Sequence, residues 1–128
     1  MMTLNPWAIL VAAVSSFLLG GVWYSALFAK VWERENGGPS QPGHPARVFG
    51  VSFVFSLLAA AAFAWLLGPA PALSHAVGTG ALVGGGLVAT SFGINYQFAQ
   101  RSWTLWAIDG GYHLLQFVLF GLVLGSWH

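Results

Sequence analysis

Residues 104–125 read TLWAIDGGYHLLQFVLFGLVLG, an apolar run of 22 residues in which Asp109 is the one charged side chain. Three more apolar runs precede it, at Trp7–Phe28, Val48–Leu67 and Ala76–Phe98, and they contain no Asp, Glu, Lys or Arg. A helix needs about 20 predominantly apolar residues to cross the hydrocarbon core of a bilayer. The sequence therefore predicts an all-α integral membrane protein, a four-helix transmembrane bundle that forms a single domain over residues 1–128.

The composition of the whole chain agrees with a membrane environment. Hydrophobic residues make up 57% of the chain and charged residues 5%, against roughly 25% charged residues in soluble domains. The formal net charge is +1, and no basic stripe is present that would neutralise phosphates, so we expect no nucleic-acid partner. The chain has no cysteine, which excludes disulfides, iron–sulfur clusters and cysteine-based zinc sites. The expected partner is the lipid bilayer.

The basic residues are distributed unevenly among the connections between the predicted helices. The first and third connections, residues 30–47 and 99–103, hold all four Lys and Arg residues, whereas the N-terminal tail, the second connection and the C-terminal end hold none. Lys and Arg are retained on the cytoplasmic side of a membrane protein. We therefore expect a multi-pass protein of the cell inner membrane, with both basic loops in the cytoplasm and both termini outside.

The first connection is rich in helix-breaking residues. Residues 30–47 contain three prolines and three glycines, and little that could be buried. We interpret this segment as a mobile cytoplasmic loop, with one helical turn carried over from the first helix through Trp32.

The first and third predicted helices end in similar ways. Tyr24 is followed by Lys30 and Trp32, and Tyr96 is followed by Arg101 and Trp103. This echo has two interpretations, a parallel repeat of two-helix units or an independent use of aromatic and basic residues at the membrane boundary.

Small residues recur at a spacing of four along every predicted helix. Apolar burial does not drive helices together in lipid, and small residues there let two backbones approach closely. The candidate helix-packing glycines are Gly20, Gly80, Gly84, Gly121 and Gly125. Two interpretations are open, a tightly packed monomeric bundle and a homo-oligomer that forms through one of these seams.

Polar residues share one face of the fourth predicted helix. They are Asp109, Tyr112, His113 and Gln116. Their spacing of i, i+3, i+4 and i+7 places them on one side of a helix. Asn95 on the third helix and Tyr24 on the first lie at a comparable depth, and they complete the predicted intramembrane polar site. An ionisable residue within a span costs about 2.5–3.5 kcal/mol on insertion scales, so its presence points to a specific role.

Three interpretations of Asp109 are open. In the first, Asp109 and His113 share a proton and serve proton or ion handling. In the second, the same two residues form a buried hydrogen-bonded pair that fixes helix register, completed by Asn95 or Arg101. In the third, residues 102–108 form an interfacial turn and Asp109 caps a helix that begins at Gly110.

Other chemistry is not indicated by the sequence. One Asp and one His supply two ligands where a metal site needs three or four, so we predict no metal and no cofactor. The chain contains no nucleophile elbow, phosphate loop, pair of carboxylates or metalloprotease helix. We therefore expect no catalytic residues and no enzymatic activity.

Several short motifs together resemble one known family. They are Asn5-Pro6-Trp7, Gly20-Gly21-Val22-Trp23-Tyr24-Ser25, Phe28, Trp32 and Asp109-Gly110-Gly111-Tyr112-His113. On these residues the chain resembles, over essentially its whole length, the bacterial membrane-protein family called domain of unknown function 1761. Members of that family usually carry Pro after the Ser of the Trp-Tyr-Ser run, and Ala26 at that place implies a less kinked helix end. The resemblance implies four spans and a joint role for the aromatic helix end and the Asp/His face, and it carries no assigned activity.

Two classes of function are open on this basis. One is a protein with its own site, a proton-linked or small-solute pathway that is lined by the polar face of the fourth helix. The other is a non-catalytic accessory or scaffold subunit of a larger membrane complex, for which glycine seams and belts of aromatic residues at the membrane boundary suffice.

Overall fold

The structure, a computed structural model, describes residues 4–35 and 45–127, and these residues form helices that are joined by short turns. In chain order the elements are α1 (Pro6–Gly21), the π-helical segment η1 (Val22–Leu27), α2 (Ala29–Glu35), α3 (Pro45–Leu67), α4 (Leu73–Ala81), the π-helical segment η2 (Leu82–Ala89), α5 (Thr90–Phe98) and α6 (Trp103–Ser126). No strand occurs in the described ranges. The predicted all-α fold is confirmed.

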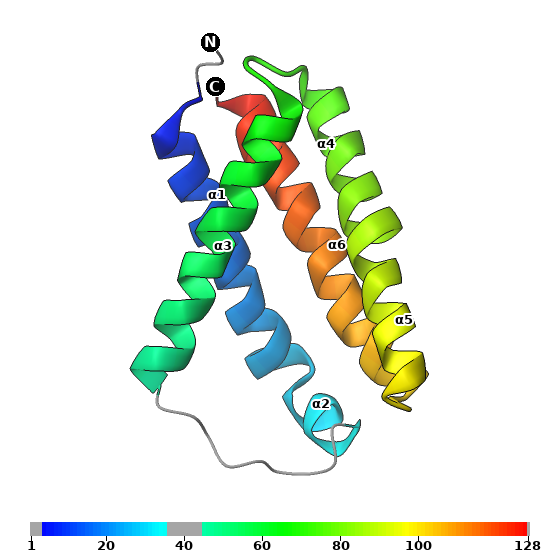
Figure 1. Ribbon diagram of the computed structural model, residues 1–128. Coiled ribbons are helices and arrows are strands. Elements are labelled where there is room, and N and C mark those ends of the chain that lie inside the picture. Colours follow the sequence, from blue (N-terminus) through cyan, green and yellow to red (C-terminus); the bar gives the residue numbers. More distant parts are fainter. Residues whose placement is uncertain (1–3, 36–44, 128) are drawn as a thin grey trace.

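Four continuous helical stretches are long and apolar enough to cross a membrane. They are the first span (Pro6–Leu27), the second span (Ala46–Leu67), the third span (Leu73–Phe98) and the fourth span (Trp103–Ser126). Figure 1 shows them as an elongated bundle in which α1 begins and α6 ends at the same end. The chain is thus a multi-pass membrane protein, while the inner membrane and the orientation of the termini stay predictions.

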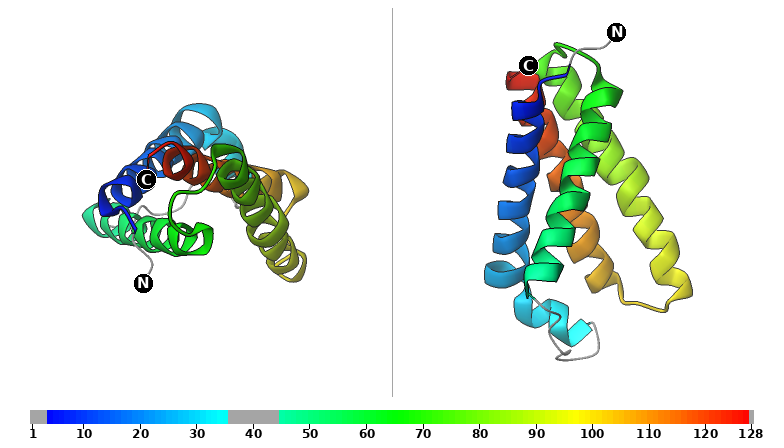
Figure 2. Two further views of the ribbon diagram at one scale, coloured as in Figure 1. Left: turned by 90° about the horizontal axis from the view of Figure 1, so that it is seen from above. Right: turned by 60° about the vertical axis from the view of Figure 1, so that its left-hand side comes forward.

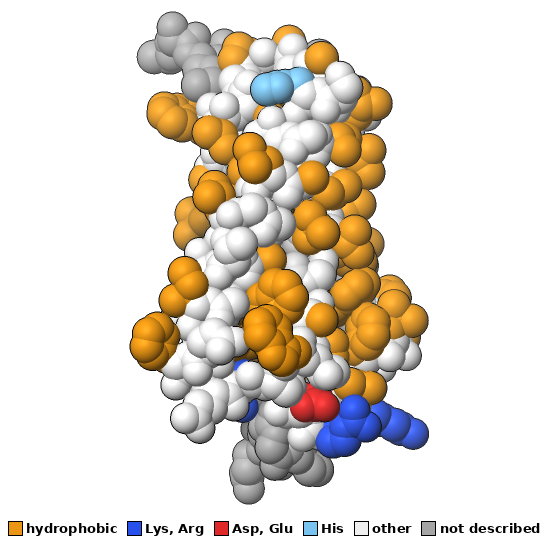
Figure 3. All heavy atoms as spheres, turned by 90° about the vertical axis from the view of Figure 1, so that its right-hand side faces the viewer, with side chains coloured by type: hydrophobic (Ala, Val, Ile, Leu, Met, Phe, Trp, Pro, Cys, Tyr) orange, Lys and Arg blue, Asp and Glu red, His pale blue; other side chains and the backbone are white. Residues whose placement is uncertain are grey.

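The outer surface of the bundle is apolar along its length. Leu18, Phe55 and Leu82 are 65%, 67% and 66% exposed. Figure 3 shows hydrophobic side chains over the middle of one face, with Lys, Arg, Asp and Glu side chains gathered at one end. Apolar surface on this scale is unfavourable in water and matches the hydrocarbon of a bilayer.

The third and fourth spans lie closer together than larger residues would allow. A Cβ atom on Gly80 would lie 2.2 Å from a backbone oxygen of α6, and a Cβ atom on Gly121 would lie 2.4 Å from a backbone oxygen of α4. The equivalent distances to the nearest atom are 2.7 Å for Gly84 and 2.9 Å for Gly125. These glycines therefore serve contact between two helices of the same chain.

The buried apolar core lies at the end of the bundle where α1 begins and α6 ends. It consists of Ala8, Ala12, Ala13, Ala60, Phe63, Ala64, Phe120 and Leu124. Gly68, with a φ of 80°, ends α3 at this same end and turns the chain towards the third span. From this turn α3 and the third span diverge (Figure 2). α3 instead follows α1, where the rings of Phe17 and Phe53 meet edge to face at 5.6 Å.

The first connection differs from the predicted loop over residues 30–47. Ala29–Glu35 forms the separate helix α2, and α3 already begins at Pro45, so the prediction of a single turn through Trp32 is too short. The chain bends at Phe28, where φ is −125°, and Ala26 lies within the preceding π-helical segment. Residues 36–44 lie outside the described residues, and the mobility of this loop stays a prediction.

Candidate functional site

Asp109 lies inside α6 and not at its start. The helix begins at Trp103, and the side chain of Ser102 caps it by accepting a hydrogen bond of 3.0 Å from the amide of Leu105. Asp109 follows in the second turn and is 8% exposed. The interpretation of Asp109 as the helix cap is therefore wrong, because Ser102 fulfils that role.

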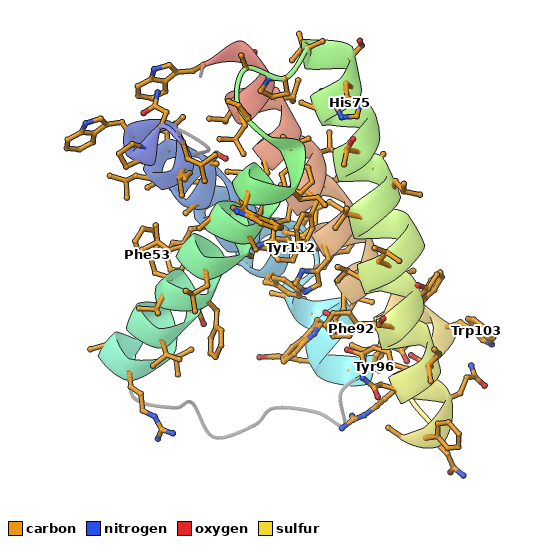
Figure 4. All side chains as sticks on the ribbon, turned by 45° about the horizontal axis from the view of Figure 1, so that its top comes forward. Phe53, His75, Phe92, Tyr96, Trp103 and Tyr112 are labelled. Carbon is orange, nitrogen blue, oxygen red and sulfur yellow. The ribbon has the colours of Figure 1, made fainter. Side chains whose placement is uncertain are left out.

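Asp109 accepts hydrogen bonds from side chains of three other elements. Tyr24 of η1 donates its hydroxyl to Oδ1 at 2.6 Å, and Trp32 of α2 donates its indole N–H to the same oxygen at 3.2 Å. Tyr96 of α5 donates its hydroxyl to Oδ2, and Figure 4 shows it pointing from the third span towards α2 and α6. These four residues, which we call the aspartate junction, tie the first span, α2 and the third span to the fourth.

The aspartate junction matches a buried carboxylate with neutral donors. An ionised carboxylate only accepts hydrogen bonds, and an indole N–H only donates them. Burying a charge is costly unless hydrogen bonds replace those of water, and the three donors supply this replacement. Because both oxygens of Asp109 are engaged, the geometry favours a role in holding helices together over ligand binding at this carboxylate.

Two further tryptophans join helices near the junction. Trp23 donates its indole N–H to the backbone oxygen of Ile108 at 2.9 Å. Trp106 donates its indole N–H to the backbone oxygen of Ala89 at 2.8 Å. The first of these bonds connects the first span to α6, and the second connects α6 to the third span, so tryptophans brace α6 on two sides.

The remaining polar residues of α6 form a second group. Nδ1 of His113 and Oε1 of Gln116 lie 2.7 Å apart and share a hydrogen bond. Tyr112 donates its hydroxyl to the backbone oxygen of Ser16 at 3.0 Å, and its ring covers Gly20, where a Cβ atom would lie 3.3 Å from the hydroxyl oxygen. These contacts connect the first span to the face of α6 that carries His113.

Two predicted partners of Asp109 lie elsewhere. Among residues 4–35 and 45–127, no hydrogen bond joins Asp109 to His113, which pairs with Gln116 instead. The side chain of Asn95 is exposed on α5, and the neighbouring Tyr96 reaches the carboxylate. The second interpretation, a buried pair of Asp109 and His113, is therefore wrong in its partner, because Asp109 is hydrogen-bonded to Tyr24, Trp32 and Tyr96 instead; its role in fixing helix register stays a prediction.

A cavity of about 770 Å³ lies between the first span, α3, η2 and α6. Its polar lining consists of Tyr24, Ser25, Ser52, Ser56, Tyr112, His113 and Gln116. Its aromatic lining consists of Phe17, Phe49, Phe55 and Phe117, besides the two tyrosines. Asp109 and Asn95 do not line it. The predicted polar site thus divides into the aspartate junction and one wall of the cavity, and Tyr24 belongs to both.

The structure offers no ready place for a metal ion in the part of the chain that it describes. No group of three or more His, Asp or Glu side chains lies close enough together there to hold one.

Trp32 and Tyr96 were not among the predicted site residues. Tyr96 lies near the end of the third span, as Tyr24 lies near the end of the first, and this similarity is the signal in the sequence that could have identified Tyr96. Trp32 belongs to the motif on which the family resemblance rests. Both residues lie near span ends, where a boundary role explains an aromatic residue equally well.

The profile of one family matches nearly the whole chain. The family is described as "Protein of unknown function (DUF1761)", and the match covers residues 7–125. The chain belongs to the DUF1761 family. No curated protein and no solved structure matches it. In this DUF1761 protein the separate motifs are in contact, because Tyr24 and Trp32 of the aromatic helix end both donate a hydrogen bond to Asp109.

Proposed function

We propose that this DUF1761 protein binds a small, mainly apolar molecule within the membrane, in the cavity beside α6. The observation that carries the proposal is the mixed lining, in which phenylalanines surround the hydrogen-bonded pair of His113 and Gln116. Ligand pockets commonly measure about 300–1,000 Å³ and combine apolar walls with a few placed polar groups. The volume of about 770 Å³ lies within this range.

Access from the bilayer is supported by the wall that α3 contributes. Phe49 and Phe55 line the cavity and are at the same time 61% and 67% exposed on the molecule. α3 also diverges from the third span beside this wall (Figure 2). A molecule dissolved in the lipid therefore reaches the cavity without crossing water, which favours an apolar ligand.

The proposed small-solute site uses the polar face of the fourth helix, but it does not include the carboxylate of Asp109. Tyr112, His113 and Gln116 line the cavity, whereas Asp109 is enclosed by its three donors. A proton-linked pathway through Asp109 would require these donors to separate first. The geometry therefore supports a binding site more strongly than a proton pathway.

The alternative of an accessory or scaffold subunit has less support. That alternative requires helix faces with closely spaced glycines that are available to contact another chain. Gly80, Gly84, Gly121 and Gly125 all face another helix of the same chain. Self-association would have to use other faces of the bundle, and no observation singles one out.

Native mass spectrometry of the protein, extracted gently from its membrane, tests the proposal. We expect an added mass from a bound small molecule on the wild-type protein, and its loss in Ser52→Phe, where the new ring projects into the cavity and obstructs it. Val51→Phe is the matched control, because Val51 is 50% exposed on the same helix and does not line the cavity. A wild-type protein without added mass, or an added mass that persists in Ser52→Phe, contradicts the proposal.

A further inference from the structure

The cavity is elongated along the helices that surround it. On α3 its lining residues run from Val48 to Ala59, and on the first span they run from Phe17 to Ser25. Positions 48 and 59 differ by 11 residues, which at about 1.5 Å per residue corresponds to about 16 Å. The hydrocarbon core of a bilayer is about 30 Å thick, so the cavity extends over about half of it. This is the depth that the acyl chain of a lipid reaches within its own leaflet.

One end of the cavity lies at the membrane boundary and the other lies inside the bundle. Val48 is in the first turn of α3, and Ser25 is in the last turn of the first span. Past Ala59, the residues Ala60 and Phe63 of α3 belong to the buried core, where α3 packs on α1. A chain that occupies the cavity therefore extends from the boundary towards the middle of the membrane.

The polar side chains of the cavity wall leave little hydrogen bonding for a ligand. The four largest, each hydrogen-bonded within the protein, are Tyr24, Tyr112, His113 and Gln116. The remaining three are serines, whose hydroxyls commonly bond backbone carbonyls of their own helix. The wall contains no Asp, Glu, Lys or Arg that would pair with a charged group. Burying a polar group without a partner is costly, so the part of the ligand that lies along this wall is hydrocarbon.

Positive charge gathers where the cavity reaches the membrane boundary (Figure 3). Arg47 directly precedes Val48, its side chain is exposed, and α3 contains no Asp or Glu. Lys30 is exposed on α2. Both glutamates of the chain also lie on α2, where Glu35 forms an ion pair of 3.5 Å with Arg34. Lys and Arg at a membrane surface attract anionic lipid head groups, and Arg47 has no acidic residue on its own helix to compete for it.

We infer that the cavity holds one acyl chain of an anionic phospholipid whose phosphate is bound by Arg47, an inference that rests on the proposed function. A phospholipid fits both parts of the site, because its chain supplies hydrocarbon over the depth of one leaflet and its phosphate supplies negative charge at the boundary. The chain enters sideways past Phe49 and Phe55, and so it never leaves the bilayer.

Photolabelling of the full-length protein in lipid nanodiscs tests this inference. Three probes carry the same diazirine-bearing acyl chain: an anionic phosphatidylglycerol, a phosphatidylcholine without net charge, and a methyl ester without a phosphate. Peptide mass spectrometry compares the label on Phe117, which lines the cavity from α6, with that on Leu58, which is 60% exposed and does not line it. We expect the phosphatidylglycerol to label Phe117 about fivefold more than the other two probes, and all three to label Leu58 equally.

Three substitutions at exposed positions locate the head group. Arg47→Gln removes the charge at the boundary, and we expect the preference for phosphatidylglycerol at Phe117 to disappear. Arg47→Lys keeps the charge and should keep the preference. Arg34→Gln removes a charge that Glu35 already pairs, and it should leave the preference unchanged.

The outcomes separate this inference from the proposed function. Equal labelling of Phe117 by the three probes, or a preference for the phosphatidylcholine or the methyl ester, overturns the inference and leaves the proposed function intact. A preference that survives in Arg47→Gln, or that is lost equally in Arg34→Gln, also overturns the inference, because Arg47 is then not the residue that binds the phosphate. Label on Leu58 with none on Phe117 for every probe shows that no hydrocarbon chain enters the cavity, and it overturns both.

Discussion

Asp109 illustrates how an apolar bundle accommodates one ionisable side chain. Its donors lie 85, 77 and 13 residues away along the chain, and together they replace the hydrogen bonds of water. The sequence singles out Asp109 as a charge within a span. It does not identify the partners, because a helix that is apolar on all sides does not show which face is buried. Asn95 and Tyr96 lie at similar depth, yet only Tyr96 meets the carboxylate.

Two substitutions at Asp109 distinguish how its shape and how its hydrogen bonds contribute to the free energy of unfolding. Asp109→Asn keeps an oxygen for Tyr24 and Trp32, and its NH2 group can donate to Tyr96, so we expect the free energy of unfolding to fall by about 1 kcal/mol. Asp109→Leu leaves all three donors without an acceptor, and we expect a fall of about 3 kcal/mol. Unfolding by SDS in mixed micelles, followed by tryptophan fluorescence, measures both changes.

Thr104→Leu is the control for these substitutions. It makes a similar polar-to-apolar change at an exposed position of the same helix, and we expect it to alter the free energy of unfolding by less than about 0.5 kcal/mol. If Asp109→Leu were no more damaging than Thr104→Leu, the aspartate junction would contribute nothing to stability.

At the scale of single elements, α2 is joined to the aspartate junction by the side chain of Trp32. None of its residues is fully buried. Trp32 donates to Asp109 and meets the ring of Tyr24 edge to face at 6.1 Å. An element with so little buried surface opens easily when its main contact is lost.

Removal of the Trp32 ring should release α2. We expect Trp32→Ala to raise the rate of tryptic cleavage after Lys30 and Arg34 about tenfold, because local opening then costs about 1.4 kcal/mol less. Trp32→Phe, which loses the N–H and keeps a ring, should fall between this variant and the wild type. Glu33→Ala changes an exposed neighbour and should leave the rate unchanged. Equal rates in Trp32→Ala and Glu33→Ala would mean that other contacts hold α2.

The packing of the third span on the fourth depends on individual glycines. Gly80→Ala would place Cβ 2.2 Å from the Phe117 carbonyl oxygen, so the helices must separate, and we expect a loss of about 2 kcal/mol. Gly78→Ala lies on the same helix with no described neighbour within 4 Å of the new atom. There we expect a gain of up to about 1 kcal/mol from helix propensity. Thermal unfolding in detergent measures both, and a shift of the same sign would refute the assigned interface.

The two tyrosines of the aspartate junction lie in different kinds of element, Tyr24 in the π-helical segment η1 and Tyr96 in the α-helix α5. Tyr24 and Tyr96 lie near the ends of the first and third spans, and both spans contain a π-helical segment. They meet opposite oxygens of one carboxylate. This agrees with a parallel repeat of two-helix units, which stays a prediction. The π-helical segments themselves have no sequence signal, because they depend on how the backbone adapts to its neighbours.

At the scale of the whole molecule, the sequence predicts the four spans but not their arrangement. The length of each apolar run determines which segments are helices. In lipid the outer faces are apolar too, so the amphipathic pattern that orients the helices of soluble proteins is missing. The divergence of α3, and with it the cavity beside His113 and Gln116, follows from which faces pack together. Only the structure shows this (Figure 2).

The divergence of α3 leads to a prediction about the bundle as a whole. The chain has no cysteine, so any disulfide within the chain must join the two introduced cysteines. Phe55 on α3 and Val88 on η2 both line the cavity. We expect Phe55→Cys combined with Val88→Cys to form no disulfide under mild oxidation, because the bond requires Cα atoms about 4.4–6.8 Å apart. A bismaleimide with a long spacer should join the pair where a short one fails.

The pair Ala76→Cys and Gly125→Cys calibrates this measurement. A Cβ atom on Gly125 would lie 2.9 Å from that of Ala76, closer than the roughly 3.5–4.5 Å of a disulfide. A small outward shift of the last turn of α6 brings the pair to that distance, so we expect it to oxidise readily in the same membranes. Rapid disulfide formation between positions 55 and 88 would show that α3 closes on the third span. The cavity would then not persist in the bilayer, and the proposed apolar ligand would have no space beside His113 and Gln116. Slow oxidation at 55–88 beside fast oxidation at 76–125 instead requires a bundle that is tightly joined along α4 and α6 and open along α3.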